Sequence, residues 1–253
     1  MKFRTISRLI YLKRARHRHG HSIHSPFLFY LVTKVIENKS KQPEYAIFKT
    51  LKTNTLILLD KLSEQSLLPV YHQFSIRHSK TRKLYKKVEL PLRYGKVIFQ
   101  LIREFQPSTI VSYGPALGTN LTLMAMANNK NFVYQVVDNS SCELLCKELL
   151  KETAISNIQF VSDHSMLKDN PDFVMINFSN KPDETLIAAN QYLKVHGDDG
   201  VLIIKGIHES KEMETIWQTI TLNESVRVTL DLFEIGIALF RNGLQKENFV
   251  LKY

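Results

Sequence analysis

Hydrophobic residues in the second half of the chain gather in short apolar runs that are separated by longer amphipathic ones. Short runs rich in β-branched residues predict buried strands, and the longer runs predict helices. The predicted strands are Thr109–Tyr113, Phe132–Val137, Ile158–Val161, Asp172–Asn177, Val201–Ile204, Val226–Leu232, Gly236–Arg241 and Phe249–Tyr253. The predicted helices are Val97–Phe105, Thr119–Ala127, Ser141–Thr153, Pro182–Val195 and about Lys211–Leu222. Such alternation indicates an α/β fold with a doubly wound, mostly parallel sheet, to which the last strands add an antiparallel pairing.

The first 96 residues differ from the rest in pattern and in charge. They contain 21 Lys and Arg against 5 Asp and Glu, a balance of +16, whereas residues 97–253 contain 13 against 19, a balance of −6. We therefore divide the chain into a basic, mostly helical N-terminal extension or cap, 1–96, and an α/β domain, 97–253. This asymmetry indicates an anionic partner for the extension, such as nucleic acid or an anionic membrane surface.

The extension begins with a basic amphipathic segment, Met1–Arg18, which has seven Lys and Arg and no acidic residue. Its apolar residues recur at helical spacing, so we expect a helix whose apolar stripe docks on the protein's own body. Anionic lipid and nucleic acid are the alternative partners of this stripe. The stripe consists of Phe3, Ile6, Leu9, Ile10 and Tyr11. A second helix is predicted at Phe27–Ile36, after a Ser25-Pro26 start signal.

Four histidines alternate with other residues between these two helices. Neighbouring arginines would repel a cation and no Cys, Asp or Glu lies nearby, so we do not expect a metal site. The histidines are His17, His19, His21 and His24. The two cysteines, Cys142 and Cys146, lie four residues apart on a predicted helix, a poor geometry for a disulfide, and indicate reduced thiols in a cytoplasmic protein. No apolar run reaches the roughly 18 residues of a membrane span, and no signal peptide is predicted.

A glycine turn follows the first predicted strand and leads into a helix. Gly114 and Gly118 bracket this turn. Backbone N–H groups at a helix N-terminus favour an anion or carboxylate, and in parallel sheets ligands bind beyond the carboxyl ends of the strands. Asp138, at the end of the second strand, can accept hydrogen bonds from a ribose diol, and Asp163 either holds an adenine amino group or serves as a turn residue. An ordinary strand-to-helix turn is the alternative interpretation.

These features resemble those of class I S-adenosylmethionine (SAM)-dependent methyltransferases. From about Arg16 to Tyr253 the chain is similar to a bacterial family of O-methyltransferase-like proteins, through the segments HRHGHSIHSPFLF, IHESKEMETIW, VTLDLFEIGIALF and KENFVL. The resemblance implies a Rossmann-like, doubly wound, mostly parallel seven-stranded sheet with an N-terminal helical extension. It also implies SAM as the cofactor and a small-molecule substrate. The cofactor-binding residues that we predict are Gly114, Pro115, Gly118, Asp138, Asn139, Asp163 and Asn177.

The chain departs from the pattern of these methyltransferases where chemistry would occur. Ser112 stands where an acid usually helps to hold the methionine ammonium group, and Asn177 stands where the family carries an Asp. Lys205 occupies the position of another acid, one of those that ligate magnesium in related catechol-type enzymes. Because Mg²⁺ prefers carboxylate oxygens and is repelled by an ammonium group, we expect no metal at this site.

The sequence therefore predicts metal-independent O-methyl transfer to a small or anionic acceptor. His208 is the predicted general base and Lys205 the residue that orients the acceptor. His21 and His24 are alternative bases, and His208 is alternatively a loop residue that caps the following helix. Lys205 alternatively only covers the vacated acidic site. Two other functions stay open: a catalytically degenerate methyltransferase fold that acts as a binding or scaffold module, and a protein whose basic N-terminus binds nucleic acid or an anionic membrane surface.

Overall fold

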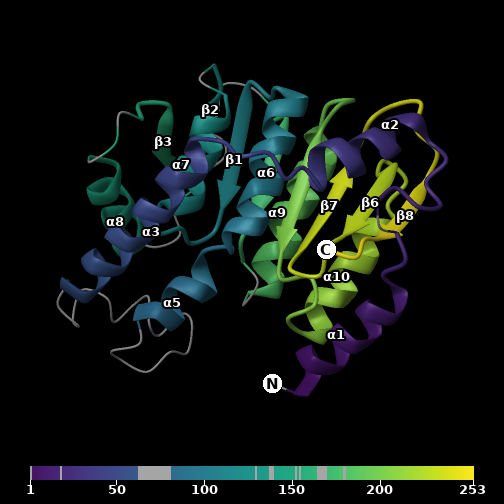
Figure 1. Cartoon of the computed structure of the whole chain (residues 1–253), viewed down its shortest axis with the longest axis horizontal. Coiled ribbons are helices and arrows are strands. Elements are labelled where there is room, and N and C mark those ends of the chain that lie inside the picture. The colour runs from purple at the N-terminus through teal and green to yellow at the C-terminus, as the bar shows by residue number, and fades with distance from the viewer. Residues whose placement is uncertain are drawn as a thin grey trace. The chain divides into compact units, whose positions relative to one another are not determined.

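The computed structural model describes residues 2–17, 19–61, 81–128, 130–136, 140–151, 153, 155–163, 170–178 and 181–253. Within these ranges eight strands form a mixed sheet in the order β3-β2-β1-β4-β5-β7-β6-β8 (Figure 1). The strands are β1 (Thr109–Tyr113), β2 (Phe132–Val136), β3 (Ile158–Val161), β4 (Phe173–Ile176), β5 (Val201–Lys205), β6 (Val228–Asp231), β7 (Ile235–Leu239) and β8 (Glu247–Val250). The α/β fold with a mostly parallel sheet is thus confirmed.

The implied number of seven strands is wrong by one. The extra strand is β8, which pairs in parallel with β6 and places Phe249 opposite Leu230. Both side chains are buried, with exposed fractions of 5% and 0%. Burial of Phe249 stabilises the pairing of β8, which continues the sheet beyond β6. The antiparallel strand of the sheet is β7, which pairs with both β5 and β6.

The chain divides into two compact units. The first unit comprises residues 1–38, 107–113 and 168–253. Its strands are paired in parallel from β1 through β4 to β5, and all residues of these three strands are buried, as expected for a sheet covered on both faces. Its helical elements are α1 (Lys2–Arg14), α2 (Pro26–Tyr30), the π-helix η1 (Leu31–Ile36), α9 (Pro182–Val195) and α10 (Lys211–Leu222).

The second unit comprises residues 39–106 and 114–167. It contains the parallel pair β2 and β3. Its helices are α3 (Glu44–Lys61), α5 (Thr81–Val88), α6 (Leu92–Phe105), α7 (Thr119–Ala127) and α8 (Ser140–Lys151). Each compact unit contains segments from both sides of residue 96, and the boundary drawn there from composition stays a prediction.

Local signals explain where several helices begin. Ser210 is the N-cap of α10, and its hydroxyl accepts the N–H of Met213 at 3.2 Å. Pro182 occupies the first turn of α9, where its missing N–H costs nothing. Ser25 caps α2 in the same way as Ser210 caps α10, but the expected continuous helix to Ile36 is replaced by a short α-helix that passes into a π-helix.

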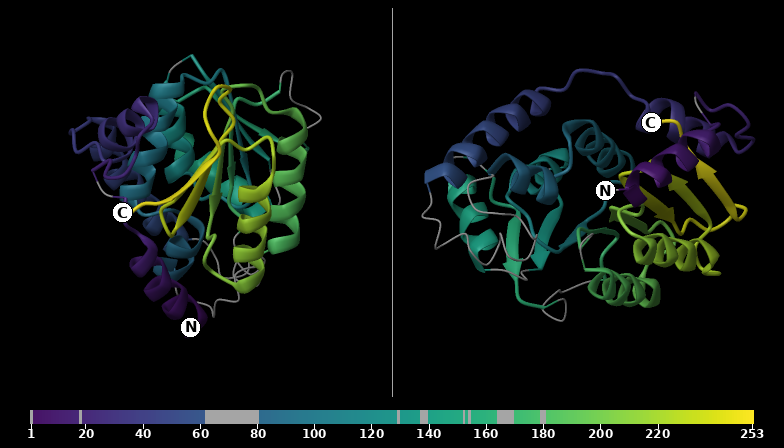
Figure 2. Two further views of the ribbon diagram at one scale, coloured as in Figure 1. Left: turned by 90° about the vertical axis from the view of Figure 1, so that its right-hand side faces the viewer. Right: turned by 90° about the horizontal axis from the view of Figure 1, so that it is seen from below.

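The first helix docks through a different face from the expected one. Figure 2 shows α1 beside the C-terminal strands, and the Tyr11 hydroxyl donates to the carbonyl of Leu251. Of the predicted stripe only Tyr11 is buried; the other four apolar side chains are exposed, so the expectation that the stripe docks on the body is wrong. The exposed four are Phe3, Ile6, Leu9 and Ile10. In the described part of the chain, no helix combines the length and apolar character needed to cross a membrane.

Candidate functional site

The glycine turn after β1 is the central feature of the second unit. Gly114 and Gly118 both have positive φ, 93° and 101°, a backbone region that glycine occupies without strain. Gly118 also packs closely: a Cβ there would lie 2.7 Å from Cδ2 of Leu149. Residues 111–120 are all buried. The two glycines are therefore required by backbone conformation and, at Gly118, by the approach of α8.

A buried carboxylate lies at the N-terminus of α7. Oε1 of Glu89 accepts the backbone N–H of Leu117 at 2.7 Å, and Oε2 accepts that of Asn120 at 3.0 Å. The Asn120 side-chain amide donates to the same oxygen. Glu89 is only 2% exposed, so the positive end of the helix dipole and these donors compensate its desolvation. The chain's own carboxylate thus occupies part of the anion position that a helix N-terminus offers.

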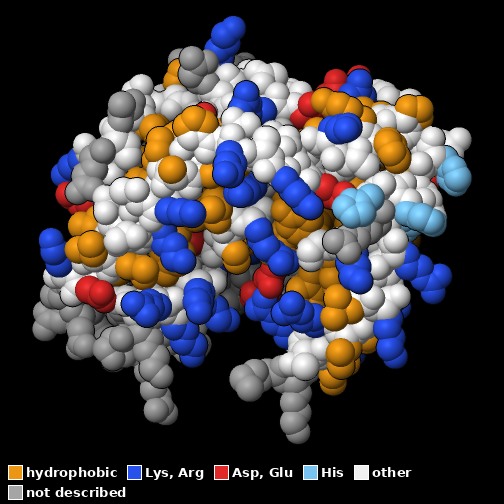
Figure 3. Space-filling model, in the orientation of Figure 1, with side chains coloured by type: hydrophobic (Ala, Val, Ile, Leu, Met, Phe, Trp, Pro, Cys, Tyr) orange, Lys and Arg blue, Asp and Glu red, His pale blue; other side chains and the backbone are white. Residues whose placement is uncertain are grey.

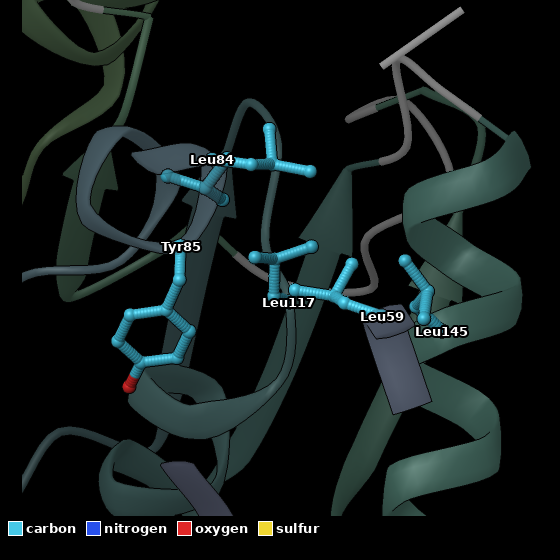
Figure 4. Packing of buried hydrophobic residues seen from close by; sticks show 6 residues of the cluster. Leu59, Leu84, Tyr85, Leu117 and Leu145 are labelled. Carbon is cyan, nitrogen blue, oxygen red and sulfur yellow. The ribbon is translucent and has the colours of Figure 1, made fainter. Parts of the chain in front are cut away.

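An apolar cluster covers the middle of the turn (Figure 4). Leu117 is fully buried and contacts side chains from α3, α5 and α8. The cluster consists of Leu59, Leu84, Tyr85, Val88, Leu117 and Leu145. The Tyr85 hydroxyl shares a hydrogen bond of 3.0 Å with Thr119 Oγ1. Burial raises the pKa of Tyr85, and the charge of Glu89 raises it further, so this hydroxyl stays protonated.

Gln135 joins the end of β2 to the start of the glycine turn. Its Nε2 donates to the Gly114 carbonyl at 2.6 Å and to the Val136 carbonyl at 2.8 Å. These two acceptors fix the orientation of the amide, because the flipped amide would set oxygen against oxygen. The other amide atom, Oε1, is buried and has no hydrogen-bond partner among the described residues. A buried acceptor without a donor is costly, so this oxygen is suited to receive an N–H or O–H from a ligand.

The predicted cofactor-binding residues differ in burial, and the structure does not describe all of them. Gly114, Pro115 and Gly118 lie together in the buried turn. Asp163 follows β3 and its side chain is exposed. Asp138 and Asn139 lie outside the described residues. The role of each of these residues in cofactor binding stays a prediction.

In the first unit, Asn177 and Lys205 stand at neighbouring positions of the sheet edge. Ile176 and Ile204 are register partners in β4 and β5, and Asn177 and Lys205 directly follow them. Both side chains are buried, with exposed fractions of 7% and 3%. A buried amide and a buried ammonium group therefore lie at the ends of neighbouring strands at this edge of the sheet. Among the described residues no group of His, Cys, Asp and Glu side chains is arranged to hold a metal ion.

Both ring nitrogens of His208 are bonded to carboxylates. Nδ1 lies 2.8 Å from Oε1 of Glu214, and Nε2 lies 2.8 Å from Oδ2 of Asp231. Burial lowers the pKa of His208, but the hydrogen bonds and charges of Asp231 and Glu214 outweigh burial and raise the pKa above its ordinary value. The ring also stacks on Phe233 at a centroid distance of 5.2 Å. This arrangement favours a structural imidazolium, and the role of general base stays a prediction that requires one bond to break.

The histidines of the first 24 residues are engaged locally or exposed. His19 Nδ1 lies 2.8 Å from Oε2 of Glu37, and His17 packs edge-on against Phe249. The rings of His21 and His24, the alternative bases, are exposed.

Comparison with known proteins supports the fold. No family model matches the chain, and no curated protein matches it in sequence. Among solved structures, a Staphylococcus aureus protein provisionally described as a caffeoyl-CoA O-methyltransferase is similar with a TM-score of 0.53 and 13% identity over 70% of this chain and 98% of that one. The O-methyltransferase TomG of Streptomyces achromogenes, involved in tomaymycin synthesis and solved in complex with SAM, has a TM-score of 0.52 and 13% identity over 72% and 92%. A methyltransferase from Geobacter sulfurreducens has a TM-score of 0.51 and 13% identity over 74% and 94%.

The chain thus has the Rossmann-like fold of these methyltransferases. At such low identity the similarity concerns the fold alone, and no residue role is transferred.

Two residues of this region were not predicted from the sequence, Glu89 and Gln135. Glu89 is the single acid within the basic stretch 77–96. Its isolation is visible in the sequence, but a count of charges does not indicate its role. Gln135 interrupts the apolar strand FVYQV with a polar side chain, and an amide on a buried strand indicates a specific hydrogen-bonding role.

Proposed function

We propose that this chain binds SAM at the glycine turn and transfers its methyl group, without a metal, to an oxygen of a small or anionic acceptor. Support comes from the shared fold and from TomG, which is an O-methyltransferase solved with SAM. The sulfonium of SAM supplies an activated methyl group when it is bound. The protein then has to hold the donor and acceptor in line, which is chiefly a matter of position and orientation.

The observation that carries the proposal is the buried amide oxygen of Gln135 beside Gly114. Ribose hydroxyls and the methionine ammonium group of SAM are donors of the kind that this oxygen lacks. The adjoining turn supplies two glycines with positive φ, which allow close approach of a ligand to the backbone. Asp138, which follows β2 in the sequence, is proposed to accept hydrogen bonds from the ribose, and Asp163 and Asn139 to contribute to the same site.

For the acceptor we propose the sheet edge formed by Asn177 and Lys205. The positive charge of Lys205, which is buried at this sheet edge, would attract an anionic acceptor. His208 lies in the same loop three residues later. It is proposed as the base only for an acceptor that displaces Glu214 or Asp231 from the ring. We also propose that the chain is related to the bacterial family with the HGHSIHSPF segment, and that it acts in the cytoplasm.

A second candidate function is a methyltransferase fold without catalysis. It is favoured by Glu89, whose carboxylate already accepts two N–H groups at the start of α7. A protein in this state would retain the scaffold and act through its surface as a binding module.

Isothermal titration calorimetry with SAM and with S-adenosylhomocysteine separates the two candidates. We expect saturable binding of both ligands, and loss of about tenfold in affinity for Asp138→Ala through a lost charge-assisted hydrogen bond. Asp198→Ala, at an exposed loop position, is the matched control and should bind like the parent. An absence of heat at millimolar ligand would favour the non-catalytic function.

A further inference from the structure

The first helix is fixed on the body by its polar face. Nη2 of Arg4 donates to both carboxylate oxygens of Glu234, at 2.5 and 2.7 Å, and Nη1 donates to Glu209 at 3.4 Å. Tyr11 packs on Phe233 at a centroid distance of 5.1 Å. Ser7 is buried on the same side of the helix. Together these contacts determine which side of α1 is turned outward.

The outward side carries the apolar stripe. Phe3, Ile6 and Ile10 follow the i, i+3, i+7 spacing that places side chains on one face of a helix, and Leu9 adjoins them. Ile6 and Leu9 have exposed fractions of 57% and 58%, and Ile10 of 46%. Figure 3 shows apolar side chains next to basic ones over α1, at the lower right of this face. Scattered exposed apolar residues are common, but four on one short helix face indicate a binding surface.

The charges that the N-terminal segment itself carries are all of one sign. The first 36 residues contain eight Lys and Arg and no Asp or Glu. Arg8, Lys13 and Arg14 are exposed on α1 itself. Basic residues that flank an exposed apolar face are typical of helices that lie in the plane of an anionic bilayer, where apolar side chains enter the acyl boundary and the cations meet headgroups.

We propose that α1 is an in-plane membrane-docking helix that binds anionic phospholipid through Phe3, Ile6, Leu9 and Ile10. The site is independent of SAM binding, and it would attach the protein to a membrane surface without spanning it. The contact with Glu234 is the anchor that keeps the stripe outward, so docking needs no release of the helix.

Two other occupants fit the observations less well. A second copy of this chain that packed α1 on α1 would bring like charges together, because a two-fold interface pairs the same patch with itself. Nucleic acid would be attracted by the cations, but phosphate offers nothing to four aliphatic and aromatic side chains.

Co-sedimentation of the full chain with vesicles tests the proposal. We expect binding to phosphatidylcholine vesicles that contain about one third phosphatidylglycerol, and weak binding to pure phosphatidylcholine, with a marked decrease as salt is raised. Ile6→Ser combined with Ile10→Ser should weaken binding by about tenfold or more through lost apolar burial. Lys13→Gln should weaken it by about fivefold.

The matched control is Ile187→Ser on α9, because Ile187 is 58% exposed and lies one turn after the acidic residues Asp183 and Glu184. It should bind vesicles like the parent, and all variants should keep the parent's thermal unfolding midpoint. The proposal is overturned if the parent ignores anionic vesicles, or if the Ile6 and Ile10 variant binds them equally well. It is also overturned if light scattering shows that this variant dissociates a dimer while neither form binds vesicles.

Discussion

Glu89 and Asn120 form a buried contact in which one carboxylate oxygen accepts both the backbone N–H, at 3.0 Å, and the side-chain amide of the same residue. The contact connects the residue that follows α5 to the first turn of α7. It holds the end of the glycine turn that enters α7, while Gln135 bonds the Gly114 carbonyl at the start of the turn. The turn is therefore held in shape by the protein itself, whether or not a ligand is bound.

Replacement of this carboxylate should destabilise the protein. Glu89→Gln keeps the shape but sets an NH₂ group against backbone N–H groups and removes the charge at the helix N-terminus. We expect a loss of about 2–3 kcal/mol in the free energy of unfolding, measured by urea denaturation. Glu224→Gln, at an exposed turn position, is the control and should change little. Equal stability of the two variants would contradict a structural role for Glu89.

The second glycine of the turn should not tolerate a side chain. In Gly118→Ala the new Cβ would approach Leu149 and the residue would keep a φ of about +100° that L-residues rarely adopt. We expect a loss of about 1–3 kcal/mol in unfolding free energy. Gly197→Ala has open space at its Cβ, and its unfolding curve should overlay that of the parent. If the Gly118→Ala protein were as stable as the parent, Leu149 on α8 would have to move away from the new Cβ without cost.

Gln135 should contribute to SAM affinity through its unpartnered oxygen. Gln135→Met has similar volume but lacks the amide, so we expect the dissociation constant for SAM to rise about tenfold in calorimetry. Gln159→Met is the control, because Gln159 is exposed on the neighbouring strand β3. An unchanged affinity in Gln135→Met would place the ligand elsewhere.

Stability should depend on pH through His208. Its pKa is raised in the folded protein, so its contribution is fully present below the unfolded value of about 6.5 and is lost as pH rises through the folded pKa. His208→Gln should therefore lower the unfolding free energy most, by about 2 kcal/mol, near pH 6, and less as the pH rises toward 9. Urea unfolding of parent and variant across this range measures the difference, with His21→Gln as an exposed control. A difference that grows with pH would contradict the imidazolium assignment.

Local sequence signals predicted most elements of the fold. Thr119–Ala127, Pro182–Val195 and Lys211–Leu222 have the predicted bounds, because each start is marked by a glycine turn, a first-turn proline or a serine cap. The π-helix at Leu31–Ile36 was not predicted, since its apolar pattern resembles that of an ordinary helix. A last strand was expected at Phe249–Tyr253, whereas the structure has it at Glu247–Val250, and its pairing beside β6 adds a strand to the seven of the resemblance.

The candidate site was predicted only in part. The sequence placed Gly114 and Gly118 at a turn, because two glycines after a buried strand are typical of a turn with positive φ. It could not show that both nitrogens of His208 are bonded, since Glu214 and Asp231 lie on two different elements. Likewise, helical periodicity identified the apolar stripe of α1 but not which side of the helix faces outward.

By itself, then, the sequence determined the order of strands and helices and the charge of the N-terminal segment, because these depend on residues close together in the chain. The tertiary structure alone decided that Glu89 meets Asn120 across 31 positions and that Arg4 turns the apolar stripe of α1 away from the body. Such contacts depend on packing between distant segments, which the periodicity of a single helix does not specify.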